Sequence, residues 1–178
     1  MQNKTTLMIF GGLILFIGIV ILSVYSLNHK TSLDPMPQSN NTQKYSNIKA
    51  LAIRLAPFQD LRKSLDSLVN LHQIEAGCIL SCAGSLRQAA IRFANQDEAT
   101  FLNEKFEIVS LSGTLSKNGS HLHIAISDST GKTIGGHLME GCLIYTTAEI
   151  MIGILPELKF VREHDPKSGY RELVIYRK

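Results

Sequence analysis

The segment Ser120–Met139, SHLHIAISDSTGKTIGGHLM, indicates the fold most directly because it reads as a complete β-hairpin. Apolar and polar residues alternate from 121 to 127, as in a strand with one buried face. The run at 128–132, DSTGK, has the residue types of a tight turn. The return strand at 133–139 again places its isoleucine and leucine on one face. The sequence therefore predicts two antiparallel strands joined by a short turn.

The turn also predicts the register of the two strands, with His123 directly opposite His137. In this register the apolar faces match as well, pairing Ile126 with Ile134 and Leu122 with Leu138. Facing side chains of an antiparallel pair have Cβ atoms about 5 Å apart, and residues i and i+2 lie about 6.6 Å apart along a strand. His121 shares the face of His123. We therefore expect the three imidazoles to converge.

Three converging imidazoles are typical of a metal site, and zinc or another divalent metal is the expected cofactor. His121, His123 and His137 are the predicted ligands. Three protein ligands leave a fourth position open for water or substrate, as in catalytic zinc sites. The alternative is a polar strand face that carries the three histidines without binding a metal.

Carboxylates that could act with such a metal are few. Glu140 follows His137 closely, and Glu149 lies on the polar side of an expected strand, so these two are the catalytic candidates. Each could hydrogen-bond a ligand or act as a general base; the alternative for each is an ordinary surface carboxylate. GxSxG, Walker A, GxGxxG and HExxH motifs are all absent. The sequence therefore assigns no reaction, and whether the protein is an enzyme stays open.

The rest of the domain, from residue 47 to 178, has one helical pattern among many short strands. Asp60 is the expected N-cap of a helix with leucines at 61, 65, 68 and 71, and His72 lies at its last turn. Besides the hairpin, strands are expected at 48–55, 77–83, 87–94, 106–115, 143–154, 158–163 and 171–177. This pattern predicts an α+β fold with a mostly antiparallel sheet and one main helix.

The N-terminal part differs in composition from the domain. Residues 7–27 carry no charge, and a helix of that length spans the roughly 30 Å core of a bilayer. We expect a tail at 1–6, a transmembrane helix at 7–27 and a flexible polar linker at 28–46, with a cleaved signal peptide as the alternative. The expected localisation is a membrane, crossed once.

The side of the membrane on which the domain lies is predicted only from its cysteines. Cys78 and Cys82 are four residues apart, about 13 Å along a strand, which is too far for a disulfide bond. With Cys142 the number of cysteines is odd. Free thiols favour a reducing compartment and hence the cytoplasmic side.

The charge balance argues against nucleic acid as a partner. The chain has 178 residues, and only three of its 18 basic and one of its 15 acidic residues precede residue 47. The domain is therefore nearly neutral and lacks the positive field on which non-specific DNA binding relies. A small molecule is the favoured partner.

Taken in order, several segments of the domain resemble the PPC family, the plants and prokaryotes conserved domain. The matching segments are Arg54–Pro57, Asp60-Leu61, Glu75–Ile79, Gly84-Ser85, Phe106–Ile108, Leu111–Thr114, Ser120–His123, Gly135–Leu138, Thr146–Glu149 and Gly169–Leu173. The resemblance implies a strongly curved antiparallel sheet with one main helix, and a homotrimer as the assembled form. The broad fold is similar to acetolactate decarboxylase and to a zinc-dependent ester hydrolase family, where an HxH…H set holds zinc. This implies the same role for His121, His123 and His137.

Plant members of the family carry AT-hooks and bind DNA, and this chain departs from them. It has no Arg-Gly-Arg-Pro hook, and Glu104-Lys105 stand where the plant proteins have Gly-Arg. The first hypothesis is therefore a membrane-anchored, trimeric PPC-domain protein whose three-histidine metal site binds or processes a small ligand. The alternatives are a DNA-binding regulator and an oligomeric interaction module without a metal.

Overall fold

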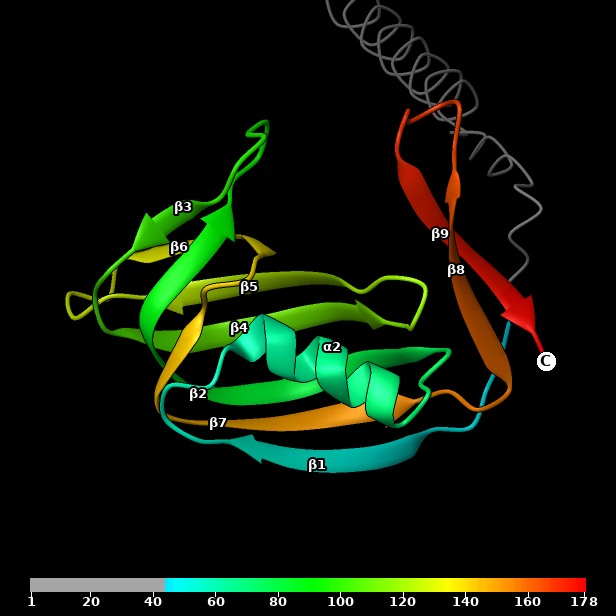
Figure 1. The fold of residues 1–178 in the computed structure, drawn as a ribbon, viewed down its shortest axis with the longest axis horizontal. Helices are drawn as coiled ribbons and strands as arrows, with labels where there is room; N and C mark the ends of the chain where they lie inside the picture. Colours follow the sequence, from blue (N-terminus) through cyan, green and yellow to red (C-terminus); the bar gives the residue numbers. More distant parts are fainter. Residues whose placement is uncertain (1–43) are drawn as a thin grey trace, which may run out of the picture. The chain divides into compact units, whose positions relative to one another are not determined.

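The computed structural model describes residues 44–178, which contain one helix and nine strands (Figure 1). The elements are β1 (Lys49–Leu55), α2 (Leu61–Leu71), β2 (Gly77–Arg92), β3 (Thr100–Leu102), β4 (Phe106–Leu115), β5 (His121–Ser127), β6 (Thr133–Leu138), β7 (Leu143–Ile154), β8 (Leu158–His164) and β9 (Arg171–Arg177). The predicted tail at 1–6, the predicted transmembrane helix at 7–27 and nearly all of the predicted linker at 28–46 lie outside the described residues.

The membrane localisation expected from the sequence is contradicted, and it is not assigned. Within residues 44–178, no helix is long and apolar enough to cross a membrane. The helix there, α2, has 11 residues, which is about 16 Å at 1.5 Å per residue and only half of a bilayer core.

Seven strands form one antiparallel sheet, in the order β1-β7-β2-β4-β5-β6 with β3 beside β2. The last strand, β6, pairs with β5 and also with the far end of β2. β2, β4, β5 and β6 therefore form a closed circuit, which gives the sheet its strong curvature in Figure 1. The predicted α+β class, with a mostly antiparallel sheet and one helix, is confirmed.

The helix α2 covers one face of this sheet (Figure 1). Its buried side chains are Leu61, Leu65 and Val69, and they meet the inward-facing isoleucines and leucines of β2, β4, β5 and β7 in one core. The alternation expected for half-buried strands is clear in β5, where Leu122, Ile124 and Ile126 are buried. Leu71, predicted on the apolar side of the helix, is instead 79% exposed because the helix ends there.

The strand β2 is longer than predicted. The sequence predicted two strands, at 77–83 and 87–94, but β2 runs without interruption from Gly77 to Arg92. An irregularity appears as register shifts against β7 near Gly84. A Cβ at Gly84 would lie 2.3 Å from the carbonyl oxygen of Thr147, so the glycine permits close strand contact rather than a turn. The short strand β3 was not predicted.

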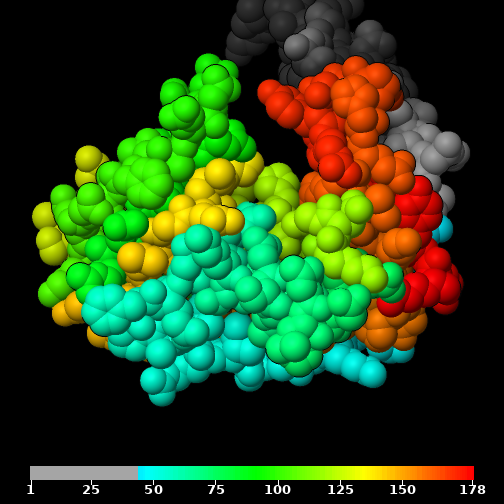
Figure 2. Space-filling model, in the orientation of Figure 1, coloured from blue at the N-terminus to red at the C-terminus, as the bar shows by residue number. Residues whose placement is uncertain are grey.

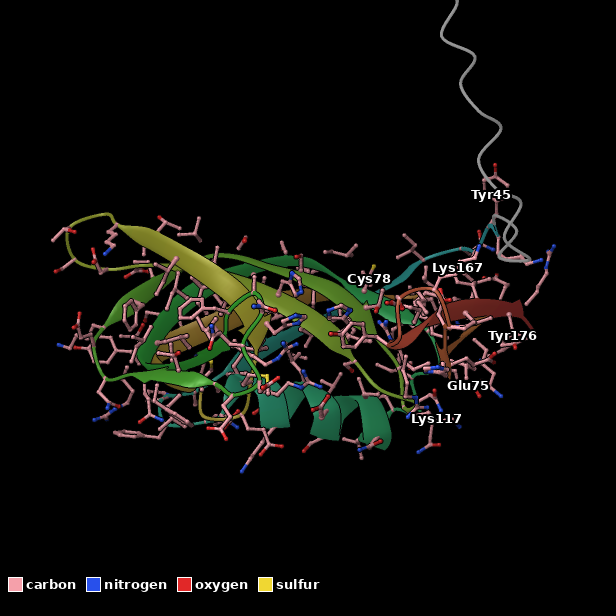
Figure 3. The ribbon with its side chains drawn as sticks, turned by 90° about the horizontal axis from the view of Figure 1, so that it is seen from above. Tyr45, Glu75, Cys78, Lys117, Lys167 and Tyr176 are labelled. Atoms are coloured by element: carbon pink, nitrogen blue, oxygen red, sulfur yellow. The ribbon has the colours of Figure 1, made fainter. Side chains whose placement is uncertain are left out.

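The hairpin of β8 and β9 forms a separate two-stranded sheet. It has its own small apolar cluster, in which Ala76, Leu158 and Phe160 are buried. Glu75 also joins it to the domain, because its carboxylate lies 3.5 Å from Nζ of Lys117 and 2.6 Å from Nζ of Lys178. Figure 3 shows Glu75 and Lys117 at this junction.

Candidate metal centre

The β5–β6 hairpin has the register predicted from the sequence, with His123 opposite His137. Its turn is held by Asp128, whose carboxylate oxygen Oδ1 accepts hydrogen bonds from the Thr130 amide at 2.8 Å and the Lys132 amide at 3.1 Å. The ladder between β5 and β6 ends at the histidine pair. Leu138 does not pair with Leu122 as predicted but with Ile91 of β2, because β6 turns from one neighbour to the other at this point.

The three histidines converge on the face of the sheet opposite the core. The Nε2 atoms of His121 and His123 are 3.1 Å apart, and the ring centroids of His123 and His137 are 4.4 Å apart. One ligand nitrogen from each ring lies within 4.8 Å of the other two. Two nitrogens bound to one tetrahedral zinc ion lie roughly 3.3 Å apart, given bonds of about 2.0–2.1 Å. The donor set and its spacing therefore fit a divalent metal.

The surroundings favour the neutral form of two of these rings. Burial lowers the pKa of His121, and the positive charges of Arg162 and His123 lower it further. Burial also lowers the pKa of His137, with Arg92 as the next cause. Metal binding requires a neutral imidazole, so the pKa directions of both side chains suit ligand function near neutral pH.

One arginine holds the strand ends that carry His121 and His137. Arg62 of α2 donates from Nη2 to the carbonyl of Ser120 and from Nη1 to the carbonyl of Leu138, both at 3.2 Å. Its Nε donates to Asp66 at 2.7 Å. These contacts bridge β5 and β6 just beyond the end of their ladder, where no backbone pairing fixes their separation.

The β8–β9 hairpin flanks the histidines on another side. Nη2 of Arg162 donates to Oγ1 of Thr114 at 2.8 Å, and Thr114 pairs with His121 across β4 and β5. The negative charge of Glu172 acts on His121 and opposes the lowering of its pKa. An arginine and a carboxylate of the hairpin therefore lie within electrostatic range of the predicted metal ligand.

A cleft of about 900 Å³ opens beside the histidines. His121 and His137 form part of its wall, together with the loop at 95–97, Arg62 and the hairpin tip at 170–172. In Figure 2 the hollow lies between the green projection that follows β2 and the orange and red hairpin. Its volume is within the range of small-molecule sites, about 300–1,000 Å³.

Comparison with known proteins decides the family. The model of the Plants and Prokaryotes Conserved (PCC) domain, also abbreviated PPC, matches residues 42–156, more than half of the chain. The chain belongs to this family.

Solved structures agree with the PCC assignment. A hypothetical protein from Salmonella cholerae-suis is 42% identical, with a TM-score of 0.75 over 77% of this chain and 99% of that one. A metal-containing protein from Archaeoglobus fulgidus is 26% identical, with a TM-score of 0.63 over 74% of this chain and 99% of that one. A putative DNA-binding protein from Bacteroides thetaiotaomicron, 20% identical over 75% of this chain and 99% of that one, shares the fold with a TM-score of 0.61.

The PCC chain also resembles part of a much larger protein. It is 45% identical over 139 residues to the bifunctional protein GlmU of a Synechococcus strain, covering 78% of this chain. It spans only about a fifth of that relative, 22% of its length. The similarity therefore concerns one segment of GlmU.

The two predicted catalytic carboxylates of the PCC domain are not brought to the histidines. Glu140 lies 3.3 Å from Nζ of Lys63 on the surface. Glu149 is on β7, opposite Arg54 of β1, and lines a different cavity. The carboxylates that line the cleft beside the histidines are Asp97 and Glu172.

The cysteines are free, as predicted. Cys142 is fully buried, and burial raises the pKa of its thiol to about 11. Burial likewise raises the pKa of Cys82 to about 11. Both thiols are therefore protonated near neutral pH and poor nucleophiles.

The arginines beside the histidines were not predicted from the sequence. Arg62 follows the predicted N-cap on the polar side of a helix, and nothing in the local pattern separates it from a surface residue. Arg92 pairs with His137 only because β6 crosses to β2. Glu172 belongs to a segment that resembles the family, Gly169–Leu173, but the resemblance gave it no role. These residues reach the site through contacts between segments far apart in the chain, and a local sequence pattern does not reveal such contacts.

Proposed function

We propose that this PCC-domain protein binds a divalent metal, with zinc as the first candidate, through His121, His123 and His137. The observation that carries the proposal is the convergence of three imidazole nitrogens within 4.8 Å on one side of the sheet. Three imidazoles suit zinc, whereas magnesium and calcium prefer oxygen ligands. A relative from Archaeoglobus fulgidus, 26% identical, is described as metal-containing, which supports the same proposal.

We propose further that the metal site binds or processes a small ligand in the adjacent cleft of about 900 Å³. A zinc ion with three protein ligands would supply a Lewis acid or an activated water at its free position. In this chain, Arg62 would fix the spacing of the ligand-bearing strands through the carbonyls of Ser120 and Leu138. The cleft wall would exclude bulk water from one side of the site.

The metal content of the purified full chain tests this proposal. Mass spectrometry should find about one zinc ion per chain after dialysis in the parent, and almost none in a His121→Ala, His137→Ala double variant. His72→Ala is the matched control, because His72 ends α2 outside the histidine cluster and should leave the zinc content unchanged. A parent that takes up no divalent metal at modest excess would refute the proposal.

We also propose a homotrimer, as the family resemblance implies. Three large apolar side chains on the adjacent strands β2, β4 and β7 support an interface there: Leu80 is 48% exposed, Val109 56% and Met151 38%. Burying such side chains between subunits would be favourable. Light scattering on the full chain should give three times the chain mass of 19.7 kDa, and Val109→Lys should shift the distribution towards monomers. A monomeric parent would rule out the trimer.

No structural observation favours DNA binding over the metal proposal. The relative described as a putative DNA-binding protein is 20% identical and supports only the fold. The argument against DNA binding is the net charge of the domain, which is close to zero. The interaction-module alternative differs from the metal proposal in one measurable quantity, the zinc content described above.

A further inference from the structure

The cleft beside the histidines is lined by charged side chains, and of these the metal proposal uses only Arg62. Arg62, Arg92 and Arg171 line it, with the acids Asp97 and Glu172. Arg162 lies close enough to His121 to lower its pKa, and Asp66 pairs with Arg62. Four arginines and three acids therefore lie around the site, so its side chains carry an excess of positive charge even without a metal.

The arginines differ in how far their hydrogen-bonding groups are already used. All three nitrogens of the Arg62 guanidinium donate to protein acceptors, so this side chain supports the wall. Arg92, in contrast, shows one side-chain hydrogen bond within the described residues, from Nη1 to the carbonyl of Gln96 at 3.1 Å. Its Nε and Nη2 donors are therefore free to meet a ligand.

The position of Arg92 directs its guanidinium towards the metal-binding side of the sheet. Arg92 pairs with His137 across β2 and β6, and side chains of paired residues leave a sheet on the same face. His137 in turn pairs with His123. The three residues therefore form a row across β2, β6 and β5, with the arginine at one end and the histidines beside it.

Arg171 lies on the opposite wall of the cleft, at the tip of the β8–β9 hairpin. Its Nε and Nη2 donate to the carbonyl of Arg162, at 3.1 and 2.7 Å. These bonds hold the guanidinium against the hairpin and leave Nη1 as a donor. Positive charge thus lines both walls.

We infer that the cleft binds a small molecule through an oxyanion group, carboxylate or phosphate, held by Arg92 and Arg171. A guanidinium matches both groups with two parallel hydrogen bonds. The inference rests on the proposed metal site for one feature, that the other end of the ligand faces the metal at the histidines. The cleft volume of about 900 Å³ limits the ligand to the size of a small metabolite.

Calorimetric titration of the full chain with malonate and with inorganic phosphate, at constant ionic strength, tests the inference. Saturable binding is expected in the zinc-loaded protein, and binding at least tenfold weaker in Arg92→Gln, since each charge-assisted contact contributes about that factor. Arg177→Gln is the control: it removes the same charge from an exposed position on the β8–β9 hairpin, outside the cleft residues, and should bind like the parent. Binding of malonate alone identifies a carboxylate ligand, and binding of phosphate alone a phosphate ligand.

The same experiment separates this inference from the metal proposal. Zinc content is measured without either anion, and both titrations are repeated on metal-free protein. Zinc uptake without saturable anion binding, or anion binding that Arg92→Gln leaves unchanged, overturns the inference and leaves the metal proposal intact. If the chain takes up no zinc but binds an anion in a way that depends on Arg92, the oxyanion site in the cleft is supported and the metal site is refuted. If Arg92→Gln fails to fold by circular dichroism, Arg171→Gln on the exposed hairpin replaces it, with the same expected loss.

Discussion

At the scale of single residues, Arg62 connects the helix to both strands that carry cleft histidines. Its carbonyl acceptors are the neighbours of His121 and His137 in the chain. Residues that orient metal ligands typically contribute 10–100-fold to metal affinity. In the proposed metal site, Arg62 would do so through the backbone rather than through the imidazole rings, which would make it a positioning residue.

We expect Arg62→Met to weaken zinc binding by about tenfold or more, because the two strand ends lose their common donor. Zinc affinity is measured by competition titration against a zinc chelator, and thermal unfolding checks that each variant is folded. Lys63→Met is the control, since Lys63 is a surface neighbour whose Nζ pairs with Glu140. Arg62→Lys should recover part of the affinity by reaching one carbonyl. Equal zinc affinity in Arg62→Met and the parent would exclude the positioning role.

The histidine cluster could be predicted because its geometry is local. The two-residue period of a strand assigns His121 and His123 to one face, and the turn sets the partner of His123. Arg62 could not be predicted, since it contacts a carbonyl 76 residues away. Such contacts depend on how helix and sheet pack, and no local pattern records that.

At the scale of elements, α2 and the loop after β6 are tied together by one carboxylate. Asp60 caps the helix by accepting from the Lys63 amide at 3.1 Å, as predicted. Its other oxygen accepts from the Gly141 amide at 2.7 Å. The loop containing Gly141 follows the strand of His137, so the cap also fixes the approach of that strand to the helix.

We expect Asp60→Ala to lower the free energy of unfolding by about 2 kcal/mol, because both the helix cap and the tie to Gly141 are lost. Asp60→Asn keeps an oxygen for the cap but loses one acceptor, so about half of that loss is expected. Urea unfolding followed by circular dichroism measures both variants. If the asparagine variant is as unstable as the alanine variant, the cap is not the stabilising contact.

The elements themselves were predicted wherever hydrophobic alternation was unbroken, as in β5 and in the six-residue return strand β6. The prediction failed at β2, where the two expected strands at 77–83 and 87–94 are one, because Gly84 accommodates close strand contact within a continuous strand. The strand β3 has three residues, too few for a periodic pattern. Its pairing with β2 is set by tertiary contacts.

At the scale of the described domain, Glu157 joins the first residues to the last. Its carboxylate accepts hydrogen bonds from the Ser46 hydroxyl and from Nδ2 of Asn47 at 2.9 Å. Its carbonyl accepts from the Lys178 amide at 2.9 Å. The hydrogen bonds from Ser46 and Asn47 lower the pKa of Glu157 to about 2, from an ordinary value of 4.5.

This lowered pKa predicts a pH-dependent contribution to stability. A carboxyl with a depressed pKa stabilises the fold above its unfolded pKa, near 4.5, and the stabilisation disappears as the pH falls towards 2. We expect Glu157→Gln to be less stable than the parent at pH 7, with the difference shrinking between pH 4.5 and 2. Urea unfolding across this range measures it. Asn47→Ala should reduce the same difference, whereas an equal effect of Glu157→Gln at pH 7 and pH 2 would contradict the assignment.

The division of the cleft between two parts of the domain has a further consequence. The wall with the histidines and Arg92 lies within the residues matched by the family, 42–156, whereas the tip at 170–172 lies beyond them. Changes to the hairpin would therefore reshape one side of the recess and leave the other untouched. Paralogues that exchange only this C-terminal segment would keep His121, His137 and Arg92 on one wall while presenting different side chains from the other.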